Sequence, residues 1–316
     1  MNTVGEKKST HSVRTGIAYA AAAYVTWGLL PLYWKLLKSV PPGQILAHRI
    51  IWSFLFTLIL LVIWKRGAAL RQALTSWKTL FVMLLCGVLI SGNWFIYIWA
   101  INHDHIVETS LGYYINPLFS VLLGMLVLKE RMNIWQQAAL LLAACGVTIL
   151  AVQYGKIPWV ALALTFSFGL YGLAKKLLAS IDSTVGLALE TLSVMPVALG
   201  YVLLTEARGD GVFGQASPVE TLLLIGGGVV TAFPLLWFAQ GSKTVPLSTM
   251  GFVQYISPTI TLALGVFLFH EPFTTVHLVS FSFIWSGLAL YSLSYTPWLT
   301  RLAASHSVKE EKNVSR

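Results

Sequence analysis

Two charged side chains lie inside long apolar segments of this sequence. Arg49 falls in the segment 44–64, and Glu190 falls in the segment 184–205. A charge within the hydrocarbon layer of a membrane is costly, so it usually pairs with an opposite charge or lines a pathway. We predict two charged layers, Arg49 with Glu108 and Glu190 with Lys176, which act as gates or as substrate contacts. Static ion pairs that fix helix packing are the alternative interpretation.

Two prolines interrupt apolar segments near their centres. Pro117 lies in 107–128 and Pro258 in 247–269. Proline has no backbone N–H to donate, so the carbonyl four residues earlier loses its helical partner and needs another one or a wet cavity. We predict kinked helices that face a central pathway, with plain kinks satisfied by neighbouring helices as the alternative. Polar or aromatic side chains stand beside the two breaks: Tyr113, Tyr114, Asn116, Gln254, Tyr255 and Ser257.

Three further groups of side chains are candidates for chemistry. Histidine titrates near neutral pH and buried carboxylates can carry protons, so His48, Glu108 and Glu190 are candidates for proton coupling. Glu130 ends one apolar segment, and we predict that it caps the helix that follows. Aromatic side chains in the apolar segments would suit an apolar ligand, although each is also typical of a core or of a membrane interface. They are Trp27, Trp94, Tyr97, Tyr113, Tyr171, Trp237, Phe252 and Tyr255.

The composition places these residues in a membrane. Of 316 residues, 56% are hydrophobic and 10% are charged, against roughly 25% charged in a soluble domain. A helix needs about 20 mainly apolar residues to span the hydrocarbon layer. By this criterion we predict ten spans, at 16–37, 44–64, 78–100, 107–128, 133–153, 158–178, 184–205, 218–240, 247–269 and 275–296.

The two halves of the chain repeat each other. A constant offset of 141 positions relates Tyr114, Pro117 and Glu130 to Tyr255, Pro258 and Glu271. Because each copy holds five spans, an odd number, the second copy must be inserted upside down. The fold class that follows is all-α and integral to the membrane, with two inverted five-helix repeats, residues 16–154 and 155–297, around a central cavity. Residues 1–15 and 298–316 are predicted to be polar tails, the first without ordered structure.

The positive charges set the orientation. If the N-terminus is inside, sixteen Lys and Arg collect on that side and four on the other. Cytoplasmic segments carry the excess of positive charge, so both termini are predicted to be cytoplasmic. The net charge of +9 is therefore interpreted as topology-setting rather than as a nucleic-acid surface.

Several function classes have no support in the motifs. The chain contains no H-E-x-x-H, no G-x-S-x-G and no nucleotide-binding loop, so neither an intramembrane enzyme nor an ATP-driven pump is expected. No cofactor and no metal site is predicted. A membrane scaffold or receptor that does not transport remains an alternative, although buried charges and paired proline breaks cost insertion energy.

Motifs in both halves resemble the EamA-type members of the drug/metabolite transporter superfamily, and within them RarD-like permeases. The resemblance is carried by His48-Arg49-Ile50, Gly92-Asn93-Trp94, Ile115-Asn116-Pro117, Glu190-Thr191 and Gln254-Tyr255-Ile256. It implies a carrier of the bacterial inner membrane that usually works as an exporter, with Arg49 as the basic residue of the second helix and Asn93 added to the cavity candidates. The expected function is secondary transport of small organic metabolites or drugs by alternating access, with an importer or facilitator of the same fold as the alternative. The expected partners are a small organic solute and the lipid bilayer.

Overall fold

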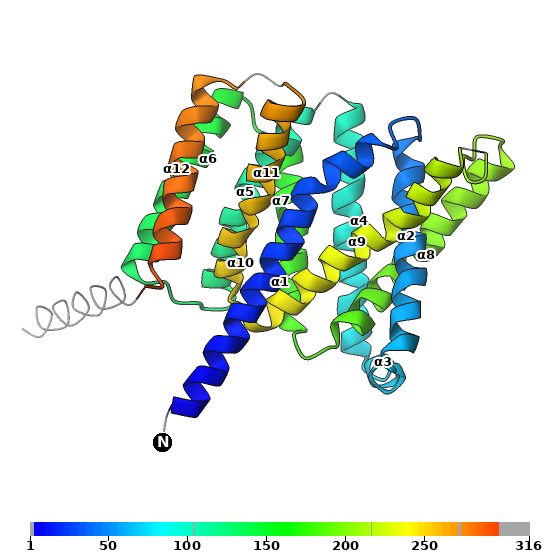
Figure 1. Cartoon of the computed structure of the whole chain (residues 1–316), viewed down its shortest axis with the longest axis horizontal. Coiled ribbons are helices and arrows are strands. Elements are labelled where there is room, and N and C mark those ends of the chain that lie inside the picture. Colours follow the sequence, from blue (N-terminus) through cyan, green and yellow to red (C-terminus); the bar gives the residue numbers. More distant parts are fainter. Residues whose placement is uncertain (1–2, 104, 216, 271–272, 297–316) are drawn as a thin grey trace, which may run out of the picture.

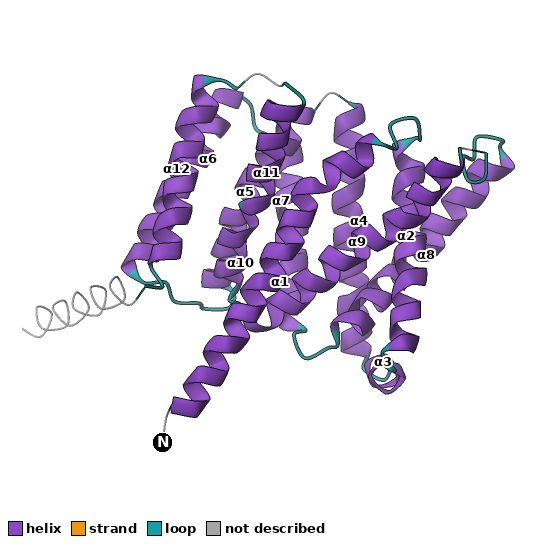
Figure 2. Cartoon of the chain, viewed as in Figure 1, coloured by secondary structure: helices purple, strands orange, loops and turns teal. Residues whose placement is uncertain are grey.

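The structure, a computed structural model, describes residues 3–103, 105–215, 217–270 and 273–296. Within these ranges the chain forms helices joined by turns and loops, and it has no strand (Figures 1 and 2). Ten spans are long and apolar enough to cross a membrane, as predicted. They are α1 (Thr3–Lys35), α2 (Pro42–Ile63), α4 (Trp77–Asn102), α5 (Ile106–Leu126), α6 (Ile134–Tyr154), α7 (Trp159–Leu177), α8 (Ser183–Ala207), α9 (Pro218–Thr244), α10 (Leu247–Gln254) with α11 (Ile256–Ala263), and α12 (Thr275–Leu293).

Two local features differ from the sequence-based expectation. Helix α1 begins at Thr3, so the prediction that the first fifteen residues lack ordered structure is wrong for the described part. A short helix not predicted from the sequence, α3 (Gly67–Leu74), joins α2 to α4. Its sequence GAALRQAL consists mainly of strong helix formers. Its buried Ala73 packs into a small apolar cluster with Met83 and Val185, which holds α3 against the bundle.

Side chains and a glycine define where several spans begin and end. Asn133 and Gln136 form a capping box at the start of α6, in which each side chain binds the other's backbone N–H. Asp182 accepts hydrogen bonds from the N–H groups at the start of α8. Helix α6 ends at Gly155, whose φ of 72° is the left-handed conformation that glycine adopts without steric cost.

The helix packing relates the two halves of the chain. The offset of 141 residues turns α1, α2, α4, α5 and α6 into α7, α8, α9, α10–α11 and α12. Helix α5 packs on α7, and their repeat counterparts, α10–α11 and α1, also pack on each other. In the same way α1 packs on α9, and their counterparts α7 and α4 are in contact. In each of three further contacting pairs, α2–α8, α5–α10 and α6–α12, the two helices are repeat counterparts of each other. This pattern of interfaces is consistent with a two-fold relation between inverted halves.

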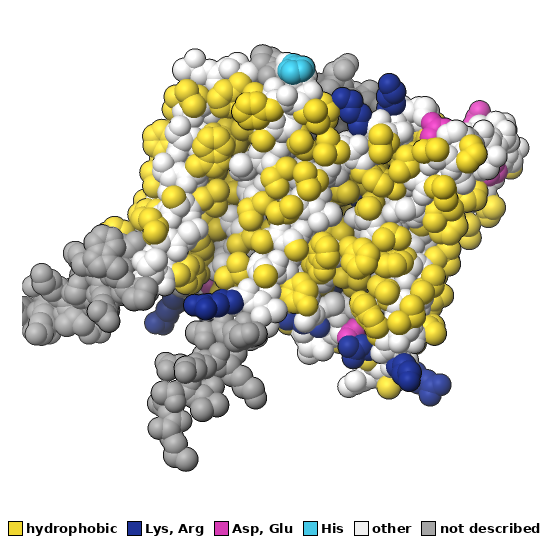
Figure 3. Space-filling model, in the orientation of Figure 1, with side chains coloured by type: hydrophobic (Ala, Val, Ile, Leu, Met, Phe, Trp, Pro, Cys, Tyr) yellow, Lys and Arg dark blue, Asp and Glu magenta, His cyan; other side chains and the backbone are white. Residues whose placement is uncertain are grey.

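The surface is divided as expected for a membrane protein. In Figure 3 hydrophobic side chains cover the middle of the visible face, and Lys and Arg gather toward its two edges. Helix α1 begins and α12 ends near the edge that is lower in Figure 1, which we call the lower edge; the opposite one is the upper edge. The bundle therefore presents an apolar band of helices between two polar rims.

Candidate functional site

A cavity of about 170 Å³ lies in the upper half of the bundle. Seven helices contribute to its wall, and both halves of the chain take part, so the cavity lies at the junction of the two repeats. The wall is mainly aromatic with a few polar groups. It consists of Tyr24, Trp27, Leu30, Pro31, Trp34, Arg49, Ile90, Asn93, Trp94, Tyr97, Ser110, Gly112, Tyr113, Tyr114, Asn116, Leu164, Phe168, Gln254, Ser257, Pro258 and Thr261.

Arg49 is held in this wall by aromatic rings. Its guanidinium carbon lies 4.5 Å from the ring centre of Trp34 and 4.3 Å from that of Trp94, both within the range of cation–π attraction. Its Nε donates a hydrogen bond of 3.1 Å to the hydroxyl of Thr231. Among the described residues no carboxylate forms an ion pair with it. Arg49 is therefore a positioned but uncompensated positive charge in the cavity wall.

Three amides lie at the same cavity. The side-chain nitrogen of Asn93 donates to the carbonyl of Leu164 and to the hydroxyl of Ser167, each at 2.9 Å. These two bonds tie α4 to α7. Asn116 and Gln254 are also buried, but their carbonyl oxygens accept no hydrogen bond within the described part of the chain. Buried acceptors without partners are costly, so these two oxygens, which have almost no accessible surface, are unsatisfied polar groups beside the cavity.

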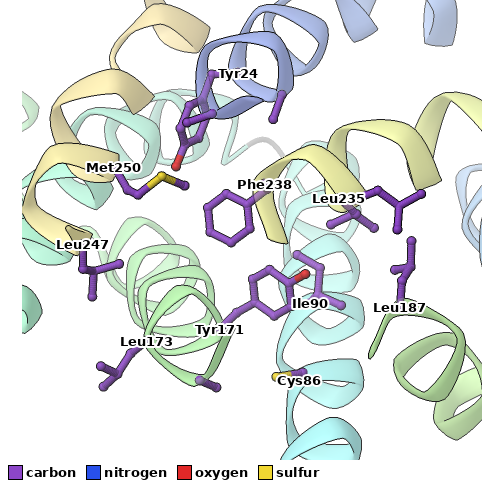
Figure 4. Close-up of a cluster of buried hydrophobic side chains, with 14 of the residues drawn as sticks. Tyr24, Cys86, Ile90, Tyr171, Leu173, Leu187, Leu235, Phe238, Leu247 and Met250 are labelled. Atoms are coloured by element: carbon purple, nitrogen blue, oxygen red, sulfur yellow. The ribbon is translucent and has the colours of Figure 1, made fainter. Parts of the chain in front are cut away.

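The lower half of the bundle is closed by a packed core (Figure 4). The ring of Phe238 stacks on that of Tyr171, with centres 5.7 Å apart, and meets Tyr24 edge-on at 6.1 Å. Leu247 and Met250 at the start of α10 are buried in the same cluster. Because Tyr24 also lines the cavity, this core forms the cavity floor.

The lower half also holds a buried ion pair. Lys175 pairs with Glu190, and their side chains are 5% and 1% exposed. The hydroxyl of Tyr171 lies 3.4 Å from the second carboxylate oxygen of Glu190. The predicted pairing of Glu190 with Lys176 is therefore wrong by one residue. The preceding lysine faces the bundle interior, and the Nζ of Lys176 donates to the carbonyl of Val245 at 2.6 Å.

The predicted pairing of Arg49 with Glu108 is also wrong. Glu108 is buried at the upper edge, where it accepts hydrogen bonds from Tyr154 at 2.6 Å and from the backbone N–H of Val160 at 2.9 Å. A ring nitrogen of His105 lies 2.8 Å from it. Glu108 thus fastens α5 to the connection between α6 and α7. A carboxylate at the start of a helix satisfies free N–H groups, and here the helix is α7.

Glu130 caps a helix other than the expected one. Its two carboxylate oxygens accept from the N–H groups of Leu247 and Ser248, at 2.7 and 2.8 Å, so it caps α10 rather than α6. A Cβ on Gly124 would lie 2.6 Å from the carboxylate, so a glycine is needed for this close approach. The contact joins the first half of the chain to the second at the lower edge. Its repeat counterpart Glu271 lies outside the described residues.

The two proline breaks differ in form. Helix α5 continues through Pro117 without interruption, whereas the ninth span ends one helix at Gln254 and starts another at Ile256. Pro258 lines the cavity and Pro117 does not. Kinks that face a transport pathway stay a prediction for both prolines, although only the second one lies in the cavity wall.

The cavity unites most of the predicted site residues and leaves others outside. His48 is buried against Phe213, with ring centres 5.0 Å apart, and neither of its nitrogens has a partner among the described residues. Phe252 stacks on Tyr291 at 3.7 Å in a separate apolar cluster. The predicted residues in the wall are Trp27, Arg49, Asn93, Trp94, Tyr97, Tyr113, Asn116 and Gln254; those outside it are Glu108, Tyr171, Glu190, Trp237, Phe252 and Tyr255.

Trp34, Pro31 and Thr261 were not singled out by the sequence analysis, yet they line the cavity. A signal for Trp34 was present in the repeat. The offset turns the pair Trp34 and Arg49 into Lys175 and Glu190, and the structure brings both pairs into contact. A contact between two residues of one half therefore predicts a contact between the residues 141 positions away in the other half.

Comparisons with known proteins agree with this architecture. A model of the EamA-like transporter family matches twice, at residues 14–152 and 156–293, once in each half. The chain is 50% identical over 296 residues to "Uncharacterized transporter YojE" of Bacillus subtilis, covering 93% of this chain and 98% of that protein. It is 41% identical over 278 residues to "Protein RarD" of Escherichia coli, covering 88% and 94%. A solved crystal structure at 19% identity, covering 90% of this chain and 99% of that one, has a TM-score of 0.69, which shows a shared fold.

These matches cover both halves and nearly the whole length of the relatives, and they agree with the ten apolar spans. The protein is a multi-pass membrane transporter, and the chain belongs to the EamA-like transporter family.

Proposed function

We propose that the protein is a secondary transporter that moves a small organic solute across the bacterial inner membrane by alternating access. The observation that carries this proposal is the cavity in the upper half above a closed lower half, at the junction of the two repeats. In carriers built from inverted repeats, the two halves exchange conformations, and the site opens to each side in turn. With both termini cytoplasmic, the cavity belongs to the outward-facing state of this cycle.

The repeat specifies which residues open in the other state. Exchange of the two halves turns the cavity residues Leu30, Tyr97 and Trp94 into Tyr171, Phe238 and Leu235. All three are at most 1% exposed and belong to the core that closes the lower half. The proposal thus accounts for aromatic rings in that core: they are the wall of the inward-facing cavity in its packed form.

The same exchange gives a role to predicted site residues that lie outside the present cavity. Arg49 becomes Glu190, and Tyr114 becomes Tyr255. Both Glu190 and Tyr255 are buried, and each is the repeat counterpart of a residue in the cavity wall. In the proposed cycle they contact the inward-facing cavity rather than the outward-facing one.

Export is the direction that we propose, because it accompanies this topology in the carriers that the sequence resembles. The contact of Glu130 with α10 holds the lower edge closed, and solute enters from the cytoplasm only after this contact opens. The relative from Pseudomonas aeruginosa named "Chloramphenicol-sensitive protein RarD", 29% identical over 284 residues, suggests that a small drug is among the solutes to be tested.

Cysteine accessibility tests the cycle directly. Tyr97→Cys and Phe238→Cys, each in a Cys86→Ser, Cys145→Ser background, place one thiol in the cavity and one at its repeat counterpart. We expect a membrane-impermeant maleimide to label Tyr97→Cys from the outside and Phe238→Cys from the cytoplasmic side. Conditions that raise one reactivity should lower the other, since the two cavities exclude each other.

A matched position on the lipid-facing surface provides the control. Leu141 on α6 is 67% exposed and remote from the cavity wall, so Leu141→Cys should show no reciprocal change. Simultaneous labelling of both test positions would indicate a channel. Labelling of Tyr97→Cys alone under every condition, with folded protein, would contradict alternating access and favour a membrane receptor.

A further inference from the structure

The cavity wall carries one formal charge among the described residues, that of Arg49, and no carboxylate. Aromatic rings and a hydroxyl stabilise this charge only in part, because no counter-ion from the protein pairs with it. A solute of opposite charge supplies that counter-ion when it binds. The positive charge of the site therefore indicates a negatively charged solute.

The contacts of Arg49 leave one part of its guanidinium free. The group has five N–H donors in a plane. Trp34 and Trp94 lie within cation–π distance of it, and its Nε is engaged by Thr231. No described residue accepts a hydrogen bond from the two terminal nitrogens. Those nitrogens form the fork that binds a carboxylate through two parallel hydrogen bonds.

The rest of the wall indicates the body of the solute. Trp27, Tyr97, Tyr113 and Phe168 line the same cavity as the two tryptophans at Arg49. Aromatic walls favour a flat apolar group. The volume of about 170 Å³ is close to the roughly 150 Å³ of an apolar cavity that holds benzene. The space in this state therefore suits a single ring with a short substituent.

We propose that the cavity binds a small organic monoanion, a carboxylate on a single aromatic ring, with Arg49 holding the carboxylate and the aromatic side chains enclosing the ring. This inference rests on the proposed function for the statement that the bound molecule is transported. The binding site itself stands on the contacts of Arg49 and on the lining of the cavity.

Three probes of similar shape separate charge from size. Phenylacetate, phenylacetamide and phenethylamine carry a negative, a neutral and a positive group on the same ring. Calorimetric titration of the full chain in detergent should show that phenylacetate binds at least about tenfold more tightly than phenylacetamide, because hydrogen bonds between two charged groups are stronger than those to a neutral amide. Phenethylamine should bind most weakly.

Variants at Arg49 assign the effect to this residue. Arg49→Met should weaken phenylacetate at least about tenfold and leave phenylacetamide within about twofold. Arg49→Lys, which keeps the charge but loses the planar fork, should lie between the two. Trp94→Leu keeps the guanidinium and should weaken acid and amide alike. Gel filtration and thermal unfolding establish that each variant is folded.

Arg208→Met is the matched control for overall charge. Arg208 is an exposed residue at the end of α8, on the same side of the bundle as the cavity but not in its wall. Its loss removes one positive charge from that side and should leave the affinity for phenylacetate unchanged. An equal loss in Arg208→Met and Arg49→Met would mean that a general field, and not a site, attracts the anion.

The outcomes distinguish this proposal from the transport cycle. Equal affinities of the three probes, tighter binding of phenethylamine, absence of binding, or an Arg49→Met loss shared equally by acid and amide would each overturn the anion site. The cycle would still stand if Tyr97→Cys and Phe238→Cys remain reciprocal. If phenylacetate binds through Arg49 but the two cysteines show no reciprocity, the anion site stands and alternating access fails.

Discussion

Arg49 and Glu190 occupy the same position in the two copies of the repeat, and their surroundings differ completely. Arg49 lines a cavity, lies against two tryptophans and has no acidic partner among the described residues. Glu190 is 1% exposed, pairs with Lys175 and lies within reach of the hydroxyl of Tyr171. The charge of Arg49 lies in the cavity wall, whereas the charge of Glu190 is neutralised by Lys175 inside a packed core.

The difference follows from which half is open. In the open half a solute or water can solvate the charge, so a counter-ion within the protein is not required. In the closed half Glu190 is 1% exposed, so an unpaired carboxylate there would bear a desolvation cost of several kcal/mol. The partner lysine stands where the other copy has Trp34. The two copies thus differ at both positions, with Trp34 and Arg49 in the first and Lys175 and Glu190 in the second.

Substitutions at Arg49 and in the Lys175–Glu190 pair should therefore affect different properties of the protein. Removal of Arg49 should affect solute binding with little effect on stability, and removal of one member of the lower pair should affect stability first. Contacts at the lower edge should show intermediate effects. An exposed pair should show almost none.

The largest loss is expected from breaking the buried pair. Glu190→Gln leaves Lys175 charged in a dry core, and removal of one partner of a buried pair typically costs about 3–5 kcal/mol. The double variant Glu190→Leu, Lys175→Met removes both charges and should recover most of the stability. Thermal unfolding in detergent, with Arg49→Met as the comparison, measures the effect. If Glu190→Gln and Arg49→Met unfold alike, the contrast between the two sites is wrong.

An intermediate loss is expected at the lower edge. Glu130→Gln keeps one acceptor oxygen where the carboxylate has two, so it removes at least one of the two hydrogen bonds to the start of α10, and the loss of a helix cap costs about 0.5–2 kcal/mol. Because these bonds join the two halves on the closed side, their loss should also favour the inward-facing state.

Accessibility separates this effect from a general destabilisation. The Glu130→Gln substitution should raise the cytoplasmic labelling of Phe238→Cys and lower the external labelling of Tyr97→Cys. Asn133→Ala, which removes a cap of α6 and no contact between the halves, is the matched control. Equal labelling in both variants would show that Glu130 has no part in closing the lower edge.

Much of the fold could be predicted from the sequence, because the signals were long and repeated. Ten apolar segments specify ten spans, and each predicted span overlaps a helix of suitable length. Helix α3 was missed because its eight residues are far fewer than the roughly 20 apolar residues by which spans were recognised. The start of α1 at Thr3 was missed because polar residues continue a helix as readily as they form a tail.

The pairing of side chains was harder to predict than the spans. Lys175 and Lys176 are adjacent, so depth along the helix does not distinguish them, and rotation about the helix axis decides which one faces Glu190. Glu108 and Arg49 were predicted to lie at similar depth, but Glu108 is in the first turn of α5, Arg49 lies deeper in α2, and different neighbours surround them. Glu130 caps a helix more than a hundred positions away in sequence. The local sequence indicates how far along a span a residue lies. The direction in which its side chain points from the helix axis, and its neighbours from distant parts of the chain, are set by the packing of the bundle.

The smallest loss is expected from an exposed pair that resembles the buried one in chemistry. The Nε of Arg66 lies 3.4 Å from a carboxylate oxygen of Asp182, with side chains 50% and 23% exposed. Water and salt screen such a pair, so Arg66→Ala should cost less than about 1 kcal/mol. Asp182→Ala should cost more, because the other carboxylate oxygen caps α8. The same unfolding assay at low and high salt tests both; a loss in Arg66→Ala as large as that of Glu190→Gln would show that burial does not determine the energetics of these pairs.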